Sequence, residues 1–385
     1  MDRNRGVGFV TVMAGGGSST GNVRVRKVVV VGGGIVGASS AYFLAKRGVE
    51  VEVLESNGVA CAASGKAGGF LALDWNDEGG NPVGSLSRAS FSLHKELARD
   101  FGPDAIGYRL ISAVAANLPE NARHEASKAS YLGYVSRETV IGTTETCAQV
   151  HPEKLTKALM RGSSATVTIA KVIGINHSDS KITSLRMEGG ATRPIADDEM
   201  VVFALGPWSN LVSKELGLPT FYGQKALSMV VPTDPPLSPY ASFTNWRGKS
   251  PEIYPRADEA YVCGFGESLR IVTEKPDEVV PLESGERQLR AFTKEILGSM
   301  GDNVPVRACH LPLAEDGIPV IGSLESNGAE NGVLAAGHSC WGILNGPATG
   351  KVVSELICDG EISLIPKWVV SSISPARFAS RTRSR

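Results

Sequence analysis

A glycine-rich turn between an apolar run and an amphipathic stretch constrains the fold of this chain more than any other segment. Val28-Val29-Val30-Val31 is a continuous β-branched run, which is typical of a strand buried on both faces of a parallel sheet. Gly32-Gly33-Gly34-Ile35-Val36-Gly37 follows and satisfies the pattern G-x-G-x-x-G. Apolar residues then recur at helical spacing up to Arg47, and Gly48 is a natural helix end. Val51 to Leu54 predicts the next strand.

This strand, turn and helix have the geometry of a dinucleotide site. Gly32 permits the tight turn, Gly34 lets the backbone approach a pyrophosphate, and Gly37 lets the helix pack closely on the strand. The start of the helix, with Ile35 and Val36, offers free N–H groups and a positive dipole to the phosphates. We therefore expect a dinucleotide cofactor at this turn.

An acidic residue ends the second strand at the position where a ribose would lie. Glu55 accepts hydrogen bonds from a ribose diol, and Ser56 follows it. The negative charge of Glu55 would repel a 2′-phosphate, which disfavours NADP. This part of the chain fits NAD and FAD equally well.

Length, charge and cysteine usage exclude several other classes of protein. A chain of 385 residues predicts two domains. Lys and Arg number 39 against 40 Asp and Glu, so no overall field attracts nucleic acid or an anionic membrane, and we expect neither as a partner. The six cysteines form no C-x-x-C pair, so we expect neither a metal site nor a disulfide framework. The 44 glycines form no repeat, so they are expected at tight turns and close approaches.

Three further segments contain small residues in a characteristic order. Ala63-Ser64-Gly65-Lys66-Ala67-Gly68-Gly69-Phe70 is predicted as a loop. Residues 167–210 predict strands that lead into Ala204-Leu205-Gly206-Pro207-Trp208. Asp316-Gly317-Ile318-Pro319 precedes a segment ending at His338, and Gly342 opens a helix through Leu356. With the dinucleotide fingerprint, these segments resemble the D-amino-acid oxidase, glycine oxidase and sarcosine oxidase superfamily of FAD-dependent enzymes (DAO family), over nearly the whole chain.

The resemblance implies FAD as the cofactor and a set of residues around it. It implies that Lys66 adds charge near the phosphates, that the backbone of Val172 contacts the adenine, and that the helix opening at Gly342 lies near the flavin's pyrimidine end. The implied cofactor-binding residues are Gly32, Gly34, Ile35, Val36, Gly37, Glu55, Ser56, Ser64, Gly65, Lys66, Ala67, Gly68, Gly69, Val172, Ala204, Gly206, Trp208, Gly337, His338, Gly342, Ile343 and Leu344.

The resemblance also implies an α/β fold with two interleaved domains. We expect a Rossmann-like FAD-binding domain of the glutathione-reductase type and a smaller α+β substrate domain built on an antiparallel sheet. The expected limits are 25–76, 150–217 and 304–378 for the first domain, 77–149 and 218–303 for the second, 1–24 for a disordered tail and 379–385 for a basic tail.

The N-terminal segment bears on localisation. Up to Lys27 it is rich in glycine, serine and arginine, with Asp2 as its one acid and no sustained apolar stretch, so we expect no signal peptide. The expected location is the cytoplasm, or a plastid or mitochondrion if this segment is a transit peptide.

The resemblance implies an oxidoreductase that oxidises the CH–NH bond of a small amine or amino acid to an imine. Oxygen is the expected electron acceptor, giving hydrogen peroxide, with another acceptor as the alternative. Two other functions stay open: an NAD-dependent dehydrogenase, and a flavin-binding protein with an interaction or trafficking role and vestigial catalysis. The sequence carries no signal for the oligomeric state.

The substrate end departs from the family pattern. A substrate carboxylate needs a fixed cation, normally arginine, and related amino-acid oxidases often carry Arg-Pro where this chain has Leu311-Pro312. The nearest alternative arginines are Arg307, Arg256 and Arg109, of which Arg256 is the candidate substrate residue. His338 is the candidate acid–base residue. Cys309 lies near the position where sarcosine oxidases bond covalently to the flavin. We expect non-covalent FAD, with a link through Cys309 as the alternative.

Overall fold

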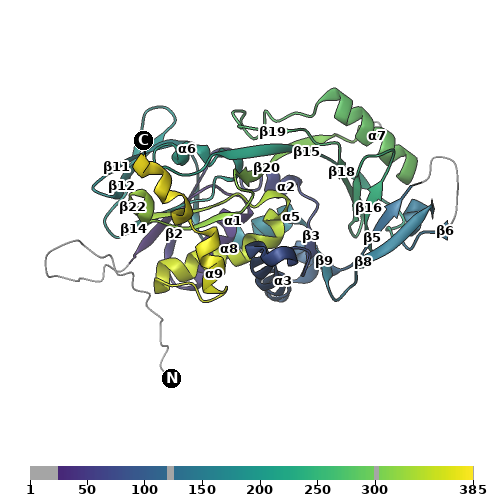
Figure 1. Ribbon diagram of the computed structural model, residues 1–385, viewed down its shortest axis with the longest axis horizontal. Helices are drawn as coiled ribbons and strands as arrows, with labels where there is room; N and C mark the ends of the chain where they lie inside the picture. Colours follow the sequence, from purple (N-terminus) through teal and green to yellow (C-terminus); the bar gives the residue numbers. More distant parts are fainter. Residues whose placement is uncertain (1–24, 119–124, 299–302, 385) are drawn as a thin grey trace, which may run out of the picture.

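Two large sheets, one toward each end of the long axis, make up most of the molecule (Figure 1). The structure is a computed structural model that describes residues 25–118, 125–298 and 303–384. The predicted N-terminal tail lies outside the described residues. No helix within them is long and apolar enough to cross a membrane.

The first sheet has six strands in the order β10-β2-β1-β14-β22-β21, and only the pair β21–β22 is antiparallel. Helix α1 (Ile35–Lys46) joins β1 to β2 and ends before Gly48, whose φ is +79°. This order confirms the predicted Rossmann-like α/β architecture. The strands are β1 (Lys27–Val31), β2 (Glu50–Glu55), β10 (Thr166–Ile169), β14 (Glu199–Phe203), β21 (Val320–Leu324) and β22 (Ala329–Ala336).

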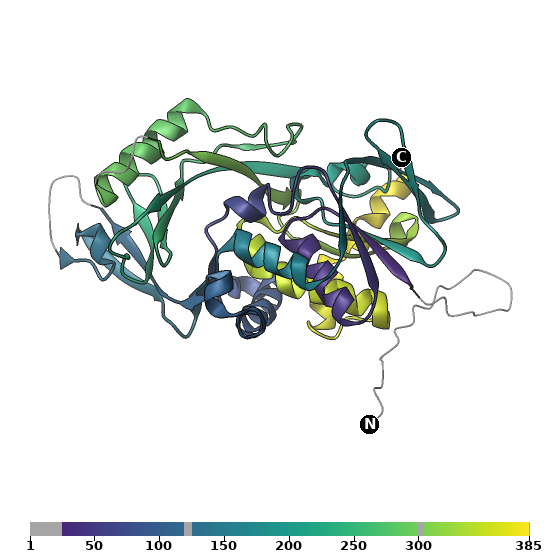
Figure 2. The same ribbon diagram turned by 180° about the vertical axis from the view of Figure 1, so that it is seen from behind.

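Both faces of this sheet are buried, as the four-valine run predicts. Val28 and Val30 pack against helices, whereas Val29 and Val31 pack toward a small antiparallel sheet. Among the helices, α1 and α5 lie side by side when the molecule is seen from behind (Figure 2). The bounds are α5 (Pro152–Gly162), α8 (Gly342–Asp359), β11 (Val172–Ser178), β12 (Lys181–Met187) and β13 (Thr192–Pro194).

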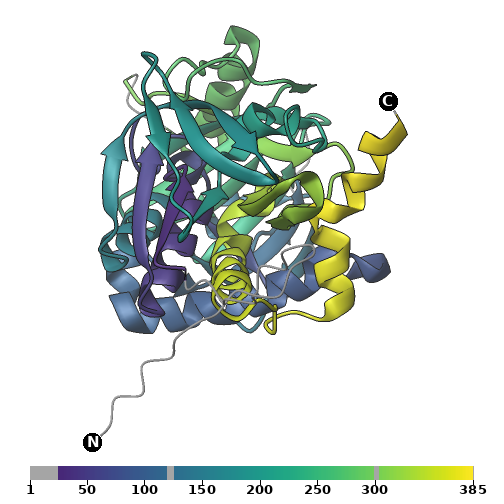
Figure 3. The same cartoon turned by 90° about the vertical axis from the view of Figure 1, so that its left-hand side faces the viewer.

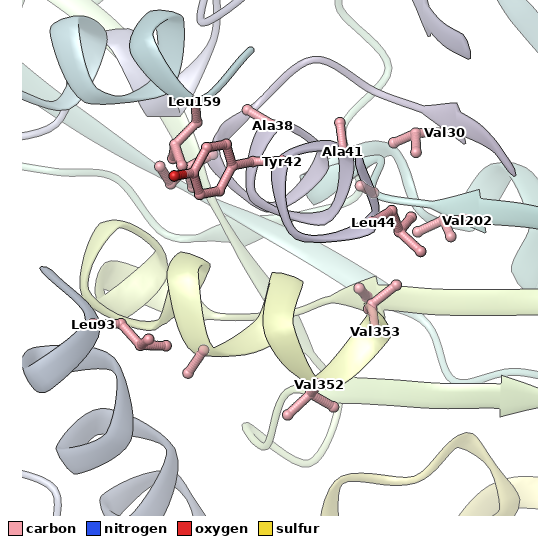
Figure 4. Close-up of a cluster of buried hydrophobic side chains, with 14 of the residues drawn as sticks. Val30, Ala38, Ala41, Tyr42, Leu44, Leu93, Leu159, Val202, Val352 and Val353 are labelled. Atoms are coloured by element: carbon pink, nitrogen blue, oxygen red, sulfur yellow. The ribbon is translucent and has the colours of Figure 1, made fainter. Parts of the chain in front are cut away.

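Helices α1 and α8 approach so closely that side chains are excluded at two positions. A Cβ on Gly350 would lie 2.4 Å from the carbonyl carbon of Ser39, and one on Gly346 would lie 2.6 Å from a side-chain carbon of Ile35. Val353 of α8 closes the same core, in which α1 and the sheet strands meet (Figure 4). Gly346 and Gly350 of α8 are therefore required for close helix packing.

The first turns of α8 depend on a third helix, α3 (Pro82–Phe101). Pro347 lies inside α8 and has no N–H, so the Ile343 carbonyl lacks its helical donor. His94 Nε2 of α3 donates to that carbonyl (3.0 Å) and to the Leu344 carbonyl (3.1 Å). The Ala348 N–H, which would reach Leu344 in a regular helix, donates to Ser90 Oγ (3.0 Å). Helix α3 thus supplies the polar partners that the proline removes.

The second sheet follows the order β19-β15-β18-β17-β16-β5-β8, with β20 paired to β15. Its two faces alternate along each strand: Ile253 and Val262 pack under helix α7 (Glu283–Leu297), whereas Tyr254 and Tyr261 lie on the opposite face, in a cluster with Phe70. The strands are β5 (Ser112–Asn117), β8 (Arg137–Gly142), β15 (Phe221–Pro232), β16 (Tyr240–Asn245), β17 (Glu252–Pro255), β18 (Glu259–Gly264), β19 (Leu269–Arg270) and β20 (Arg307–Ala314).

Three features differ from the expectations. The second sheet is mixed, because β5 and β16 pair in parallel. Helix α3 falls in the expected substrate segment 77–149 but packs on α8. Its polar side chains, such as His94, form hydrogen bonds with the backbone of that helix. Strand β20 falls in the expected FAD-binding segment 304–378 but pairs within the second sheet. The remaining domain limits stay a prediction.

Short elements complete the chain. Helix α9 (Lys367–Ile373) and the 3-10 helix η6 (Pro375–Ser384) run along one side of the molecule, next to the edge strand β21 (Figure 3). Further short elements are α2 (Ala63–Lys66), β3 (Phe70–Ala72), α4 (Pro103–Ile106), β4 (Arg109–Leu110), β6 (Glu125–Ala126), β7 (Tyr134–Val135), β9 (Cys147–Gln149) and α6 (Asn210–Ser213).

The contact between α3 and α8 predicts how His94 affects stability. Complete burial lowers the pKa of His94 to about 4, so the folded protein holds it neutral. A histidine in the unfolded chain has a pKa near 6.5. The stability that the neutral, buried His94 contributes to the folded protein is therefore fully present above about pH 6.5 and is lost as the pH falls toward 4. His94→Leu removes the donor and should cost about 2 kcal/mol or more of unfolding free energy at pH 7.

A matched variant separates the hydrogen bond from the titration. His94→Gln keeps an N–H donor near the Nε2 position but does not titrate, so we expect it to stay closer to the parent at pH 7 and to lose less stability at pH 5. Denaturant unfolding at both pH values measures this. Equal losses for the leucine and glutamine variants at pH 7 would count against the hydrogen-bond role.

Candidate flavin site

A cavity of about 390 Å³ lies where the carboxyl ends of the first sheet meet β20. Ligands of open α/β sheets bind at this edge. Val31 and Glu55 line the cavity at the ends of β1 and β2, Ala204 follows β14, and Leu311 contributes from β20. The cavity is therefore bounded by both sheets.

The glycine turn folds as the fingerprint predicts. A Cβ on Gly37 would lie 1.9 Å from the Gly32 carbonyl oxygen, so only glycine lets α1 start this close to β1. The first four N–H groups of a helix lack an acceptor within the helix, and here the N–H of Ile35 donates to Ser64 Oγ (2.9 Å). Gly34 and Val36 line the cavity beside it. This arrangement fits an anionic pyrophosphate.

Glu55 ends β2 on the cavity wall, at the position where the sequence predicts a ribose. Its Oε2 accepts from the Gly33 N–H (2.6 Å) and its Oε1 from the Asn57 N–H (2.9 Å). Oε1 also accepts from Ser56 Oγ (3.2 Å) and from the Gly58 N–H (3.4 Å), so the acceptor position left for a ribose hydroxyl is the second one on Oε2. The backbone bonds hold the carboxylate on the cavity wall.

The predicted loop at 63–70 begins as one helical turn, α2, and only part of it faces the cavity. Ser64 and Ala67 line it. Lys66 points elsewhere, because its Nζ donates to the carbonyls of Ala308 (2.9 Å) and Pro276 (3.4 Å). The lysine therefore ties α2 to the second sheet, and its ammonium does not lie among the cavity-lining groups expected around the phosphates.

The glycines of this loop serve contacts within the protein. A Cβ on Gly68 would lie 2.2 Å from the Tyr254 ring, and Gly65 and Gly69 are equally crowded by backbone carbonyls. Their small size is thus explained without a cofactor. The predicted residues that line the cavity are Gly32, Gly34, Ile35, Val36, Glu55, Ser56, Ser64, Ala67, Val172, Ala204, Gly206, Trp208, His338, Gly342 and Ile343; those that do not are Gly37, Gly65, Lys66, Gly68, Gly69, Gly337 and Leu344.

The opposite end of the cavity is formed by the start of α8. Gly342 and Ile343 line it, together with the exposed Cys340. His338 is buried, and its Nε2 lies 2.9 Å from Thr349 Oγ1. Burial lowers the pKa of His338 to about 4, so the imidazole is neutral near pH 7. A neutral, hydrogen-bonded imidazole suits a fixed wall of the site.

Arg256, the candidate substrate residue, is committed to the protein. Its guanidinium donates to Glu259 Oε1 (2.6 Å) and to the carbonyls of Ala67 (3.0 Å) and Gly68 (3.3 Å). It does not line the cavity. These hydrogen bonds hold the loop after α2 against β17 and β18. The geometry therefore does not support the predicted role of Arg256 in binding a substrate.

Cys309 is buried in β20 and is not among the residues lining the cavity. Burial raises the pKa of its thiol to about 11, which keeps it protonated near pH 7. A protonated thiol is a poor nucleophile. This geometry gives a covalent flavin link no assistance.

Six aromatic side chains gather beyond the α8 end of the cavity. Phe70 stacks on Tyr254 with ring centroids 5.7 Å apart, and Tyr254 stacks on Tyr261 at 5.8 Å. Trp75 contacts Phe70 at 4.9 Å. The cluster comprises Phe70, Trp75, Phe243, Tyr254, Tyr261 and Trp341.

Glu252 lies on the same face of β17 as Tyr254 and is half-buried. Tyr254 Oη donates to Glu252 Oε2, and Cys263 Sγ lies 3.6 Å from the same oxygen. Sequence reasoning missed Glu252 and the aromatic cluster. The alternation Glu-Ile-Tyr opposite Tyr-Val-Cys was the available signal, but it identifies a shared face only once β17 and β18 are paired.

Comparison with known proteins is consistent with this geometry. The chain matches the family model DAO, described as FAD dependent oxidoreductase, over residues 27–356. The chain belongs to the DAO family. A Schizosaccharomyces pombe protein named as an oxidoreductase is 31% identical over 383 residues, which cover 88% of this chain and 95% of the relative. The glycine oxidase of Bacillus licheniformis is 26% identical, covering 89% and 95%.

The fold of this DAO-family chain is also found in solved structures. The glycine oxidase from Geobacillus kaustophilus has a TM-score of 0.74 at 22% identity, covering 91% of this chain and 99% of that chain. Membership of an FAD-dependent family decides between FAD and NAD, which the fingerprint alone left open.

Glu55 provides a test of the nucleotide end. Glu55→Gln removes the charge and one acceptor position, so we expect FAD affinity to fall about tenfold, the size expected for one hydrogen bond to a charged group. Glu50→Gln, at the exposed start of the same strand, is the control and should bind FAD as the parent does. Titration of the apoprotein with FAD, followed by flavin fluorescence, measures both. Equal affinities for the two variants would contradict the role of Glu55.

Proposed function

We propose that this FAD-dependent oxidoreductase oxidises the CH–NH bond of a small amine to an imine, which water then hydrolyses. The observation that carries the proposal is the position of the α8 end of the cavity, whose lining residues Cys340 and Gly342 flank Trp341 of the aromatic cluster. A flavin that spans from Glu55 to Gly342 would end beside those rings.

The described residues fit FAD. At the start of α1 the Gly33 and Ile35 N–H groups already donate to Glu55 and Ser64, so the amides of Gly34 and Val36, which line the cavity, suit the pyrophosphate. The carboxylate of Glu55 suits a ribose, and the start of α8 suits negative charge at the far end. When bound, the flavin supplies the acceptor for a hydride equivalent from the substrate carbon.

The protein's own part in such a reaction is mostly positioning. The aromatic cluster excludes water, and the neutral His338 fixes the start of α8 through Thr349. The described part of the chain places no histidine or lysine at the α8 end of the cavity with a pKa suited to proton transfer near pH 7. Orientation of the C–H bond is therefore the principal contribution.

We also propose non-covalent FAD and oxygen as the electron acceptor. The position and high thiol pKa of Cys309 support the first. The glycine oxidase relative supports the second by its name alone. Localisation in the cytoplasm, with an organelle as the alternative, stays a prediction.

The test is anaerobic reduction of the purified yellow protein by a panel of amines and amino acids. We expect loss of the flavin absorption with at least one amine, its return with oxygen together with hydrogen peroxide, and release of all colour into the supernatant after acid precipitation. Bound flavin that no compound reduces would favour a binding or trafficking role. Colour left on the precipitate would establish a covalent link.

A further inference from the structure

We propose that Glu252 and the aromatic cluster form a subsite for a cationic group of the substrate, so that the enzyme acts on alkylamines with a second positive charge and no carboxylate. This inference rests on the proposed amine oxidation and names the substrate class for that same site. It is based on the charge, the burial and the position of the residues around Glu252.

The first observation is a carboxylate without a cation. Among the described residues, none that is basic forms an ion pair with Glu252. Its Oε2 receives Tyr254 Oη and Cys263 Sγ, and no described residue donates to Oε1. Burial is the main cause that raises the pKa of Glu252. Buried carboxylates are normally paired, so an ammonium arriving with the substrate would supply the missing charge.

The second observation is the composition of the surrounding walls. The rings of Phe70 and Tyr254 are stacked, with Phe243 in edge contact with both. Phe70 and Tyr261 both stack on Tyr254, so the attraction of aromatic faces for a cation comes from the rings of the cluster that no neighbour covers, and it adds to the field of the carboxylate. A carboxylate in the same place would meet Glu252 as a like charge.

The third observation locates this group at the flavin end of the cavity. Tyr261 Oη donates to the carbonyl of Lys66 (3.0 Å). The next residue in the chain, Ala67, lines the cavity. Trp341 lies between Cys340 and Gly342, both of which also line it. Trp341 contacts Trp75 with centroids 6.4 Å apart. Desolvation and, to a smaller extent, the charge of Glu252 raise the pKa of Cys340, which lines the cavity, so Glu252 lies next to the cavity wall.

The fourth observation is where the cations lie. In the part of the chain that the structure describes, the basic side chains lining the cavity, other than the neutral His338, are Lys171 and Lys275, which lie by the nucleotide end. Arg256 is held by Glu259 and two carbonyls. Leu311, an apolar residue of β20, lines the cavity wall. Nothing in this arrangement offers a bidentate partner to a substrate carboxylate.

The reacting nitrogen is not the best occupant of this subsite. That nitrogen must release its proton before its C–H bond can be oxidised, whereas a carboxylate partner favours the protonated form. A second cationic group has no such conflict. The geometry thus assigns Glu252 to the distal end of a doubly charged amine.

An inert cation tests the subsite without turnover. Tetramethylammonium has no lone pair to be oxidised, so its binding to the flavin-loaded protein can be measured from the flavin spectrum and from thermal unfolding. We expect saturable binding by the parent and about tenfold or greater weakening in Glu252→Gln, which keeps the side-chain shape and a partner for Tyr254. Acetate and benzoate should bind more weakly than tetramethylammonium.

Glu283→Gln is the matched control. Glu283 is an exposed carboxylate at the start of α7, on the far side of the same sheet, so this variant should bind tetramethylammonium as the parent does. Equal binding by the parent and Glu252→Gln, or a preference of the parent for acetate, would overturn the inference. Absence of flavin, or of any reduction by amines, would overturn the proposed function instead, and thermal unfolding would still report on the cation.

A reversal of charge supplies a second test. Leu311→Arg combined with Glu252→Gln places a cation on the cavity wall and removes the anion. We expect the double variant to bind benzoate more tightly than tetramethylammonium, the opposite of the parent. A folded, flavin-loaded double variant that keeps the preference of the parent would contradict the assignment.

Discussion

The first turns of α8 are the constraint on which the rest of this structure depends. Pro347 leaves buried carbonyls without helical donors, and His94 and Ser90 of α3 restore the hydrogen bonding there. Gly350 brings the same helix against α1. The starts of these two helices, one after β1 and one at Gly342, line the same cavity, and α3 packs against α8.

The second sheet supplies the other half of the site by simple alternation. Ile253 and Val262 bury one face under α7, which leaves Glu252, Tyr254 and Tyr261 on the face toward the cavity. The apolar face packs against α7, and the mixed face carries the residues of the proposed cation subsite. Arg256 and Lys66 join the sheet to the loop after α2, so charged groups that a sequence suggests for ligands instead fasten the two halves together.

Whether an element could be predicted from the sequence depends on how far apart in the chain its interacting residues lie. The β1–α1–β2 unit and Glu55 follow from the sequence, because valine runs, glycine spacing and a terminal acid act within one short segment. Helix α3 could not be assigned to its place, since His94 acquires a role only against Pro347, far away in the chain. The sequence suggested that Gly68 contacts the cofactor, but this position requires glycine because a Cβ there would collide with the Tyr254 ring. Glu252 required the pairing of two strands.

The central claim is that the flavin end of this site recognises positive rather than negative charge on an amine. The most direct measurement is the anaerobic rate of flavin reduction by an alkyl diamine and by the ω-amino acid of the same chain length, in which a carboxylate replaces one ammonium. The account predicts faster reduction by the diamine, with the difference lost in Glu252→Gln. Faster reduction by the amino acid would contradict it.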